Sequence, residues 1–131
     1  RIAATGSGFE PGHLYADAPY LGDGLAGVVS ACLDSAGLAA VLQTVYCSFN
    51  GERYWAREFG VARIRNAAAF ADEARMEHPA ECFGDLGAAH GVALAALACH
   101  GLAGGYRPGP ALVYASSDKG DRAAVIFERS T

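Results

Sequence analysis

The fold is decided by the stretch Gly84-Asp85-Leu86-Gly87-Ala88-Ala89-His90-Gly91 and by the apolar run Val92-Ala93-Leu94-Ala95-Ala96-Leu97-Ala98-Cys99 that follows it. The glycines predict a tight turn, and the run predicts a helix that is apolar on nearly every side. A helix exposed to water keeps a polar stripe, so a helix without one is predicted to be buried all round. We therefore expect a central buried helix over about residues 85–103, in a chain that is part of something larger.

Composition and charge limit the class of protein. The 131 residues are enough for one domain with a core, and a hydrophobic content of 52% argues against a disordered chain. The ten Lys and Arg residues are scattered and the net charge is −4, so we expect no nucleic-acid partner. The chain begins at Arg1 rather than at Met, which fits a fragment or a processed product.

Neither membrane insertion nor a metal centre is predicted. Residues 86–103 are long enough to span a bilayer, but two histidines and many weakly hydrophobic Gly and Ala residues argue against insertion, and we expect no signal peptide. None of the cysteines forms a Cys-x-x-Cys pair or has zinc-ligand spacing with a histidine. We expect no metal, no cofactor and a cytoplasmic protein with reduced, buried thiols. The cysteines are Cys32, Cys47, Cys82 and Cys99.

Hydrophobic periodicity and turn residues predict alternating strands and helices. Apolar residues between Leu25 and Leu33 recur at helical spacing after Gly22-Asp23, and Gly37 is expected to end this helix. In chain order we expect an edge strand (1–7), a loop (9–20), a helix (22–37), a buried strand (40–48), a helix (52–65), a second short helix (67–77), an extended segment at His78-Pro79, the buried helix (85–103), and a hairpin of strands 111–116 and 122–129 around a turn at 117–121. This order predicts a mixed or mostly parallel sheet.

Three segments resemble the C-terminal half of the β-ketoacyl-acyl-carrier-protein synthases, which have the thiolase-like fold. Residues 21–38 are similar to the first helix of that half, Leu86-Gly87-Ala88-Ala89 to a motif after a catalytic histidine, and residues 112–127 to the last two strands. The resemblance implies an α/β thiolase-like half-fold, a mixed β-sheet with helices packed on both faces, and helix 85–103 between two sheets. It implies that residues 1–131 are a single C-terminal, ketosynthase-like domain of a larger chain.

The resemblance also implies which residues the chemistry needs. These enzymes use a cysteine nucleophile from the N-terminal half, and two histidines from the C-terminal half stabilise the developing negative charge. The positions that match these histidines hold Ser48 and Gly84 here, and Pro79 matches a lysine upstream of the second one. None of the cysteines here occupies the position of the nucleophile. The resemblance therefore predicts that the fold is retained without its usual chemistry.

Nearby polar residues are candidate substitutes for the missing groups. Cys47, Ser48 and Asn50 lie at the end of a predicted strand, where functional groups gather in α/β sheets. Glu52 and Asp85 could supply carboxylates. The alternative interpretation is structural: Cys47 packs, Ser48 and Asn50 make a turn, Glu52 opens a helix and Asp85 caps one.

The remaining histidines and aromatic residues are interpreted as structural. His90 is expected to be a core or interface histidine, with an acid or base role as the alternative. The aromatic residues of helix 52–65 have helical spacing and are expected in the core, with an acyl-binding surface as the alternative; they are Tyr54, Trp55 and Phe59. Three histidines are expected to be solvated, namely His13, His78 and His100. Residues 116–121 lack the glycine spacing of a phosphate loop.

Three hypotheses about function remain open. The first is a catalytically degenerate, ketosynthase-like bacterial protein that acts in assembly, acyl binding or partner binding. Its expected partners are an N-terminal thiolase-like half, a second copy in a homodimer, and an acyl carrier protein or acyl-CoA. The second is the C-terminal half of an active 3-oxoacyl-acyl-carrier-protein synthase, an acyltransferase whose nucleophilic cysteine lies in a missing N-terminal half. The third is a free-standing domain that shares half the fold but not the activity.

Overall fold

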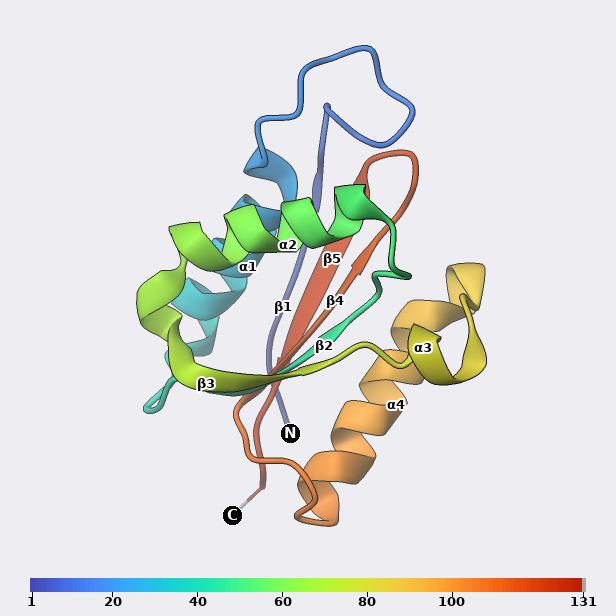
Figure 1. Ribbon diagram of the computed structural model, residues 1–131. Coiled ribbons are helices and arrows are strands. Elements are labelled where there is room, and N and C mark those ends of the chain that lie inside the picture. The colour runs from blue at the N-terminus through green and yellow to red at the C-terminus, as the bar shows by residue number, and fades with distance from the viewer. Residues whose placement is uncertain (131) are drawn as a thin grey trace.

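A computed structural model of the chain describes residues 1–130 and contains one five-stranded sheet between helices (Figure 1). In chain order the elements are β1 (Ile2–Phe9), α1 (Asp23–Ala36), β2 (Leu42–Cys47), α2 (Arg53–Arg65), η1 (Ala67–Ala69), β3 (Phe70–Glu77), α3 (Ala80–Phe83), η2 (Gly87–Ala89), α4 (His90–Ala103), β4 (Ala111–Ser116) and β5 (Asp121–Phe127). The two elements marked η are single turns of 3-10 helix. Within this part of the chain no helix is long and apolar enough to cross a membrane.

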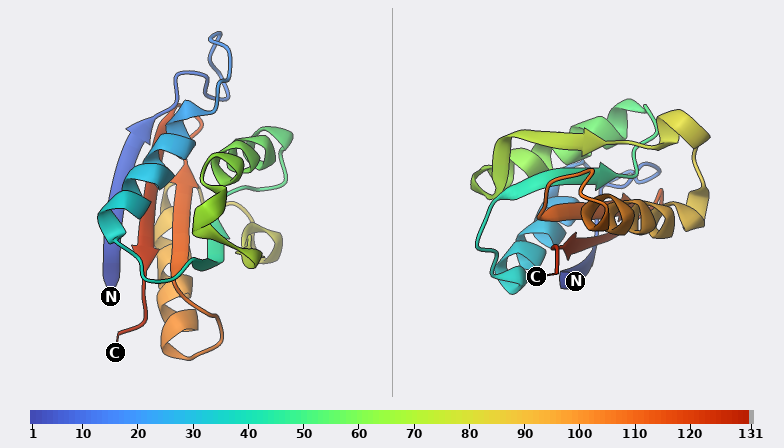
Figure 2. Two further views of the ribbon diagram at one scale, coloured as in Figure 1. Left: turned by 90° about the vertical axis from the view of Figure 1, so that its left-hand side faces the viewer. Right: turned by 90° about the horizontal axis from the view of Figure 1, so that it is seen from below.

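The sheet combines parallel and antiparallel pairs, as the sequence predicts. Its strand order is β1-β5-β4-β2-β3. Strands β4, β2 and β3 run parallel to one another, whereas β5 runs antiparallel to both of its neighbours, β1 and β4. Figure 2 shows β1 at one edge of the sheet and β3 at the other. The edge position of the first strand and the C-terminal hairpin are therefore confirmed.

Helices α1 and α2 cover one face of the sheet, and the main core lies between them and the strands (Figure 1). The apolar stripe of α1 packs inward, with Leu25, Val29 and Cys32 fully buried. The helix ends before Gly37, whose φ of 55° lies in the left-handed region that glycine adopts at low cost. Residues from α2 and the strands complete this core; among them are Leu42, Val45, Cys47, Phe59, Ala62, Phe70, Leu112, Tyr114, Ala124 and Ile126.

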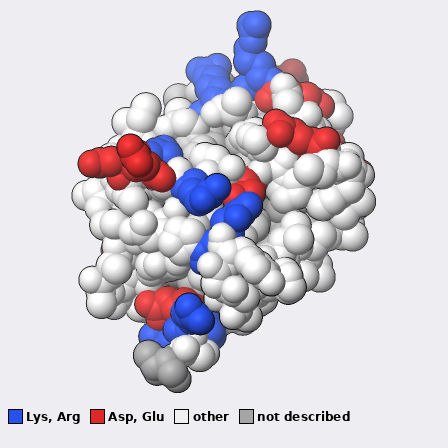
Figure 3. All heavy atoms as spheres, turned by 60° about the horizontal axis from the view of Figure 1, so that its bottom comes forward, with Lys and Arg blue, Asp and Glu red and all other residues white. Residues whose placement is uncertain are grey.

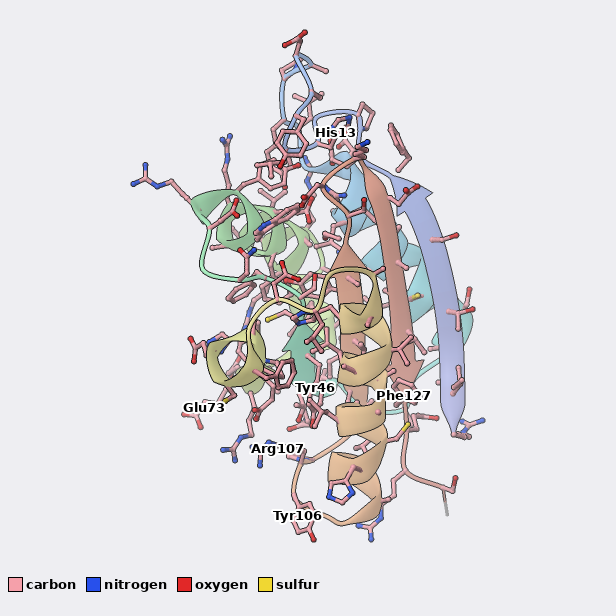
Figure 4. All side chains as sticks on the ribbon, turned by 90° about the vertical axis from the view of Figure 1, so that its right-hand side faces the viewer. His13, Tyr46, Glu73, Tyr106, Arg107 and Phe127 are labelled. Atoms are coloured by element: carbon pink, nitrogen blue, oxygen red, sulfur yellow. The ribbon has the colours of Figure 1, made fainter. Side chains whose placement is uncertain are left out.

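Helix α4 covers the opposite face (Figure 4). Its inner side is buried at Leu94, Ala98 and Leu102, which pack in a second cluster with Tyr46 and Phe127. Its outer side is open, and in Figure 4 this side faces the viewer. The prediction of a helix buried on all sides from residue 85 is therefore wrong for this chain. The helix begins at residue 90, and residues 1–130 form a single sheet, which covers one side of it.

Residues 67–77, predicted as a second short helix, instead form η1 and the strand β3. β3 pairs in parallel with β2, and Phe70 and Met76 contact the main core. Pairing along the open edge of the sheet outweighs the local helix propensity of this segment, which is a tertiary effect. The extended segment predicted at His78-Pro79 does not include Pro79, which has helical backbone angles and precedes α3 as its N-cap.

Two cysteines depart from the prediction of buried thiols. Cys32 and Cys47 are buried, whereas Cys82 and Cys99 are exposed. Cys82 lies in the short helix α3, and Cys99 lies on the open side of α4. All four are free thiols, and the exposure of Cys99 follows directly from the uncovered side of that helix.

Candidate functional site

Several predicted site residues line one cavity at the end of the sheet. The cavity has a volume of about 930 Å³ and lies where β2 and β4 end and β5 begins. Ser48 and Asn50 approach it from the end of β2, and Asp85 and His90 approach it from the segment that leads into α4. Further lining residues include Phe9, Trp55, Ala88, Ala115, Lys119 and Arg122. The fold thus brings together residues that are 35 or more positions apart in the chain.

Asp85 connects the two segments on either side of this cavity. Asn50 Nδ2 donates a hydrogen bond to Asp85 Oδ2 at 3.2 Å, and the Gly87 backbone N–H donates to Asp85 Oδ1 at 2.7 Å. The bond from Gly87 is the main reason why the pKa of Asp85 lies below its ordinary value. A charged Asp85 therefore holds the turn before α4, which agrees with the structural interpretation of this residue.

His90 is buried, with 3% of its surface exposed, and its two ring nitrogens have different surroundings. The Leu86 backbone N–H donates to Nδ1 at 3.3 Å, and Asp85 Oδ1 lies 3.6 Å from the same nitrogen. Because Nδ1 accepts a hydrogen bond, the neutral ring carries its proton on Nε2. Nε2 is buried and has no hydrogen-bond partner within residues 1–130. His90 is thus a core histidine of which only one nitrogen is satisfied.

Ser48 is tied into a polar network under the cavity. The Ser116 backbone N–H donates to Ser48 Oγ at 3.1 Å, and the Ser116 hydroxyl donates to Glu58 Oε1. Glu58 forms an ion pair with Arg122 at 2.7 Å, and both side chains are almost completely buried. Burial raises the pKa of Glu58, and the bonds from Ser116 and Arg122 oppose that rise. The network fixes β4, β5 and α2 around Ser48.

The buried acidic and basic residues of this region were not identified from the sequence. A signal for two of them exists. Glu58 lies among Trp55, Phe59 and Ala62 on the apolar side of α2. Arg122 precedes Ala124 by two residues and Ile126 by four in β5, so all three side chains point to the core side of the sheet. A charged residue on an apolar side predicts a buried partner of opposite charge. Glu10 gives no such signal.

Glu10 supplies the N-terminal cap that α1 lacks in its own sequence. Gly22 precedes the helix and has no side chain to accept a hydrogen bond. The buried Glu10 carboxylate instead accepts from the backbone N–H groups of Gly24, at 2.8 Å, and Gly12, at 2.9 Å. A carboxylate at a helix N-terminus is favourable because the first N–H groups and the helix dipole are both directed at it.

Cys47 and Glu52 lie in positions that do not favour a chemical role. The Cys47 thiol is fully buried and donates to the Glu77 carbonyl oxygen at 3.3 Å. Burial raises its pKa to about 12, so the reactive thiolate is scarce at neutral pH. Glu52 is exposed at the start of α2, where its backbone N–H donates to Asn50 Oδ1. Both positions match the structural interpretation.

The backbone at Gly84, one of the two positions that the sequence resemblance aligns with a histidine, does not suit a histidine. Its φ is 80° and its ψ is −178°, a combination that only glycine adopts without strain. A Cβ added at Gly84 would meet no atom within 4 Å, so the obstacle is backbone conformation rather than space. Histidine at this position would need a different path of the chain between α3 and η2.

The histidines predicted to be solvated differ from one another. His13 is half-buried, and its Nδ1 atom is buried without a hydrogen-bond partner in the described part of the chain, so the prediction fails for that nitrogen. His78 is half-buried, and its Nδ1 lies 3.3 Å from Glu81 Oε2. His100 is exposed. His78 and His100 line a second cavity of about 540 Å³ between the β3–α3 segment and α4, together with Phe83, Leu97, Tyr106 and Arg107.

The prediction that the aromatic residues of α2 lie in the core is confirmed for Trp55 and Phe59 but not for Tyr54. Trp55 and Phe59 are buried, and Phe59 stacks on Tyr114 with ring centroids 5.2 Å apart. Tyr54 is half-buried, and its hydroxyl donates to the Gly12 carbonyl oxygen at 2.8 Å. Within residues 1–130 no group of three or more His, Cys, Asp or Glu side chains is arranged to hold a metal ion.

No family model and no curated protein sequence matches this chain. Among solved structures it is similar to the oxazolomycin ketosynthase domain OzmH KS8 of Streptomyces albus JA3453, with a TM-score of 0.68 and 15% sequence identity. The match covers 99% of this chain and 47% of that chain, so this protein spans about half the length of its structural neighbour. The order of strands and helices around the mixed sheet thus matches half of the thiolase-like fold of a ketosynthase domain.

Proposed function

We propose that this chain is a ketosynthase-like domain without condensing activity, which acts by pairing with a second thiolase-like half across the outer side of α4. The observation that carries the proposal is the open apolar side of this helix. Val92 is 75% exposed and Leu97 is 37% exposed, although α4 contains no Asp, Glu, Lys or Arg. Exposed apolar patches of this kind commonly mark interaction sites.

The size of the structural match supports this choice of partner. The chain matches 47% of the solved ketosynthase domain, so that domain contains at least as much chain again. A second layer of similar size would cover the side of α4 that one sheet leaves open. The second cavity begins at the same side of the helix, because Leu97 and His100 line it, and a partner there would bury further apolar surface from Phe83 and Tyr106.

The distribution of charge also favours an apolar partner. Helix α4 contains no Asp, Glu, Lys or Arg. Figure 3 shows charged side chains in a few separate groups on the displayed side, with wide uncharged areas between them. An interface core is typically depleted of charge in this way.

The absence of condensing activity is inferred from the two positions that match the family histidines. Ser48 is engaged with Ser116, and Gly84 has a backbone conformation that histidine would strain. Removing one donor that stabilises negative charge costs a factor of about 10²–10³ in rate, so losing both leaves little of the ordinary mechanism. The buried thiol of Cys47 does not replace them.

Pairing is tested by the reactivity of Cys99, which lies on the open side of α4. The chain is expressed alone and together with the part of the solved ketosynthase domain that it does not match, which serves as the second thiolase-like half, and alkylation by iodoacetamide is followed by mass spectrometry. We expect Cys99 to react in the isolated chain and to be protected at least about tenfold in the pair. Val92→Lys abolishes the protection, whereas Ile64→Lys, at a position that is 78% exposed on α2, leaves it unchanged.

Equal reactivity of Cys99 with and without the second half contradicts the pairing. Protection that depends on the concentration of this chain alone identifies a second copy as the occupant instead. The alternative function, one half of an active 3-oxoacyl-acyl-carrier-protein synthase, is supported by the cavity that gathers Asp85 and His90. It is tested by incubating the paired halves with malonyl- and acyl-carrier protein, where we expect neither condensation nor decarboxylation.

A further inference from the structure

The two edges of the sheet differ in their protection against pairing with another strand. β1 and β3 are the edge strands, and within residues 1–130 each pairs on one side only (Figure 2). Natural edge strands are usually protected by charged side chains or proline, because unpaired backbone N–H and C=O groups otherwise bind a further strand. β1 contains no charged residue and no proline over the eight residues Ile2–Phe9. β3 contains four charged residues, namely Asp72, Glu73, Arg75 and Glu77.

The glycines of β1 are explained by the helix that covers one face of this strand. A Cβ added at Gly6 would lie 2.9 Å from Cys32 Sγ, and one at Gly8 would lie 2.7 Å from Val28 Cγ2. α1 thus approaches β1 so closely that no side chain fits at these two positions. The exposed positions between and beside the glycines are not restricted by this packing, and a lysine or glutamate would fit there. The fold therefore does not require the absence of charge along this edge.

A bulge near the start of β1 places its two large apolar side chains on the same face of the sheet. Ile2 lies opposite Phe127, and Phe9 lies opposite Asp121. Phe127 and Asp121 are six residues apart in β5 and therefore point to one face, the face on which α4 packs. Ile2 and Phe9 are seven residues apart and would point to opposite faces without the bulge. Ile2 is 60% exposed and Phe9 is 57% exposed, so both are available for contacts beyond this chain.

These features make β1 complementary to an antiparallel copy of itself. A two-fold axis perpendicular to the sheet at Gly6 places this residue opposite its own counterpart. Counted along the β1–β5 register, Thr5 then lies opposite the second copy's Ser7, and Ile2 lies opposite the second copy's Phe9. An axis at Thr5 leaves Phe9 beyond the end of the other strand, and an axis at Ser7 does the same to Ile2. The register at Gly6 is therefore the one that covers both exposed apolar side chains.

We propose that two copies of this chain associate edge to edge through β1, about a two-fold axis at Gly6. Backbone hydrogen bonds supply the attraction, and each end of the interface adds one contact between Ile2 and Phe9. No charged residue of β1 opposes a like charge. One pair of short strands makes a small interface, so the dissociation constant should be roughly 10–100 µM. The interface lies outside α4 and does not rest on the pairing proposed there.

Cross-linking by designed cysteines tests the register. Thr5→Cys and Ser7→Cys are made separately in a chain whose exposed thiols are removed by Cys82→Ser and Cys99→Ser. The two variants are oxidised mildly, alone and mixed, and mass spectrometry identifies the linked peptides. Only residues directly opposite each other come close enough for a disulfide. The mixture should therefore give at least about fivefold more disulfide dimer than either variant alone.

Sedimentation velocity of the unmodified chain over a range of concentrations measures the association itself. Ser7→Lys should weaken it at least about tenfold, because two added lysines approach each other across the axis and protect the edge. Glu73→Gln is the matched control, since it changes the net charge by the same amount at an exposed position of the other edge, and it should change nothing. Circular dichroism and the midpoint of thermal unfolding establish that each variant is folded.

A chain that stays monomeric well above the expected dissociation constant overturns the proposal, and so does equal cross-linking in the mixture and in the single variants. A dimer that Val92→Lys dissociates and Ser7→Lys does not lies at α4 and also overturns it. A series of larger species in place of a dimer means that β1 pairs with β3 of the next copy, which contradicts the two-fold axis. Failure of the Cys99 protection experiment leaves these outcomes unaffected, because they concern a different surface of the chain.

Discussion

The two faces of the sheet are covered by helices to different depths. On one face, α1 and α2 contact each other as well as the strands, and Leu25 and Val29 are fully buried. On the other face, α4 is a single layer, so Leu94 is fully buried whereas Val92, two residues earlier, is 75% exposed. The comparison shows that an apolar sequence indicates where burial is favourable, but that a side chain is buried only where a second layer covers it.

The largest effect is expected from breaking the buried ion pair on the face covered by α1 and α2. Glu58→Ala leaves the Arg122 guanidinium in the core without its partner and removes the acceptor of the Ser116 hydroxyl. We expect the free energy of unfolding to fall by about 3–5 kcal/mol, measured by urea denaturation. Arg75→Gln, which alters an exposed pair on β3, is the control and should cost about 1 kcal/mol or less. Equal costs for the two variants would mean that the buried pair does not support this face.

Three leucine substitutions compare the faces directly. Leu25→Ala in α1 and Leu94→Ala on the inner side of α4 both empty fully buried sites, and each should cost about 2–5 kcal/mol. Leu97→Ala, on the outer side of α4, should cost about 1 kcal/mol or less in the isolated chain because this side chain is 37% exposed. The midpoint of thermal unfolding measures all three. A large cost for Leu97→Ala would show that the outer side of α4 is already covered in solution.

These differences also explain how much of the molecule could be predicted from its sequence. Helix α1 was predictable because its signals are local: an apolar stripe from Leu25 to Cys32 and a glycine at its end. Strand β3 was not, because its pairing with β2 comes from a distant part of the chain and overrides its local propensity. The depth of burial of α4 was not predictable either, since it depends on whether a second layer covers the helix and not on the helix sequence alone.

The features of the candidate site likewise divide into those that could be predicted from the sequence and those that could not. The gathering of Ser48, Asn50 and Asp85 was predictable from a resemblance in the order of motifs, and the structure places all three at one cavity. The unsatisfied Nε2 of His90 was not predictable, because it depends on which nitrogen the Leu86 N–H reaches. Glu58 and Arg122 are 64 residues apart, and the sequence indicates their pairing only because each is a charged residue on the apolar side of its helix or strand.

A smaller effect is expected where a distant residue caps α1. Glu10→Gln keeps one carbonyl oxygen but removes the charge that accepts from Gly12 and Gly24. The free energy of unfolding should fall by about 1–3 kcal/mol, since hydrogen bonds to a charged group are stronger than neutral ones. Asp17→Asn in the same loop, at an exposed position, is the control and should be neutral. If Glu10→Gln is also neutral, then the carboxylate acts only as an acceptor and its charge contributes nothing to the cap.

The smallest effect is expected at the start of α4, where the pKa of Asp85 is lowered by the Gly87 N–H. A carboxyl group whose pKa is lower in the folded state stabilises that state above its unfolded pKa, and this contribution is lost as pH falls through the folded value. The turn before α4 should therefore loosen below about pH 4, while the α1 and α2 face remains intact. Amide hydrogen exchange at Gly87, compared with exchange in α1, measures this difference. Asp85→Asn should remove the pH dependence at Gly87 and Asp72→Asn should preserve it; the same acid response in both variants would show that another group controls this turn.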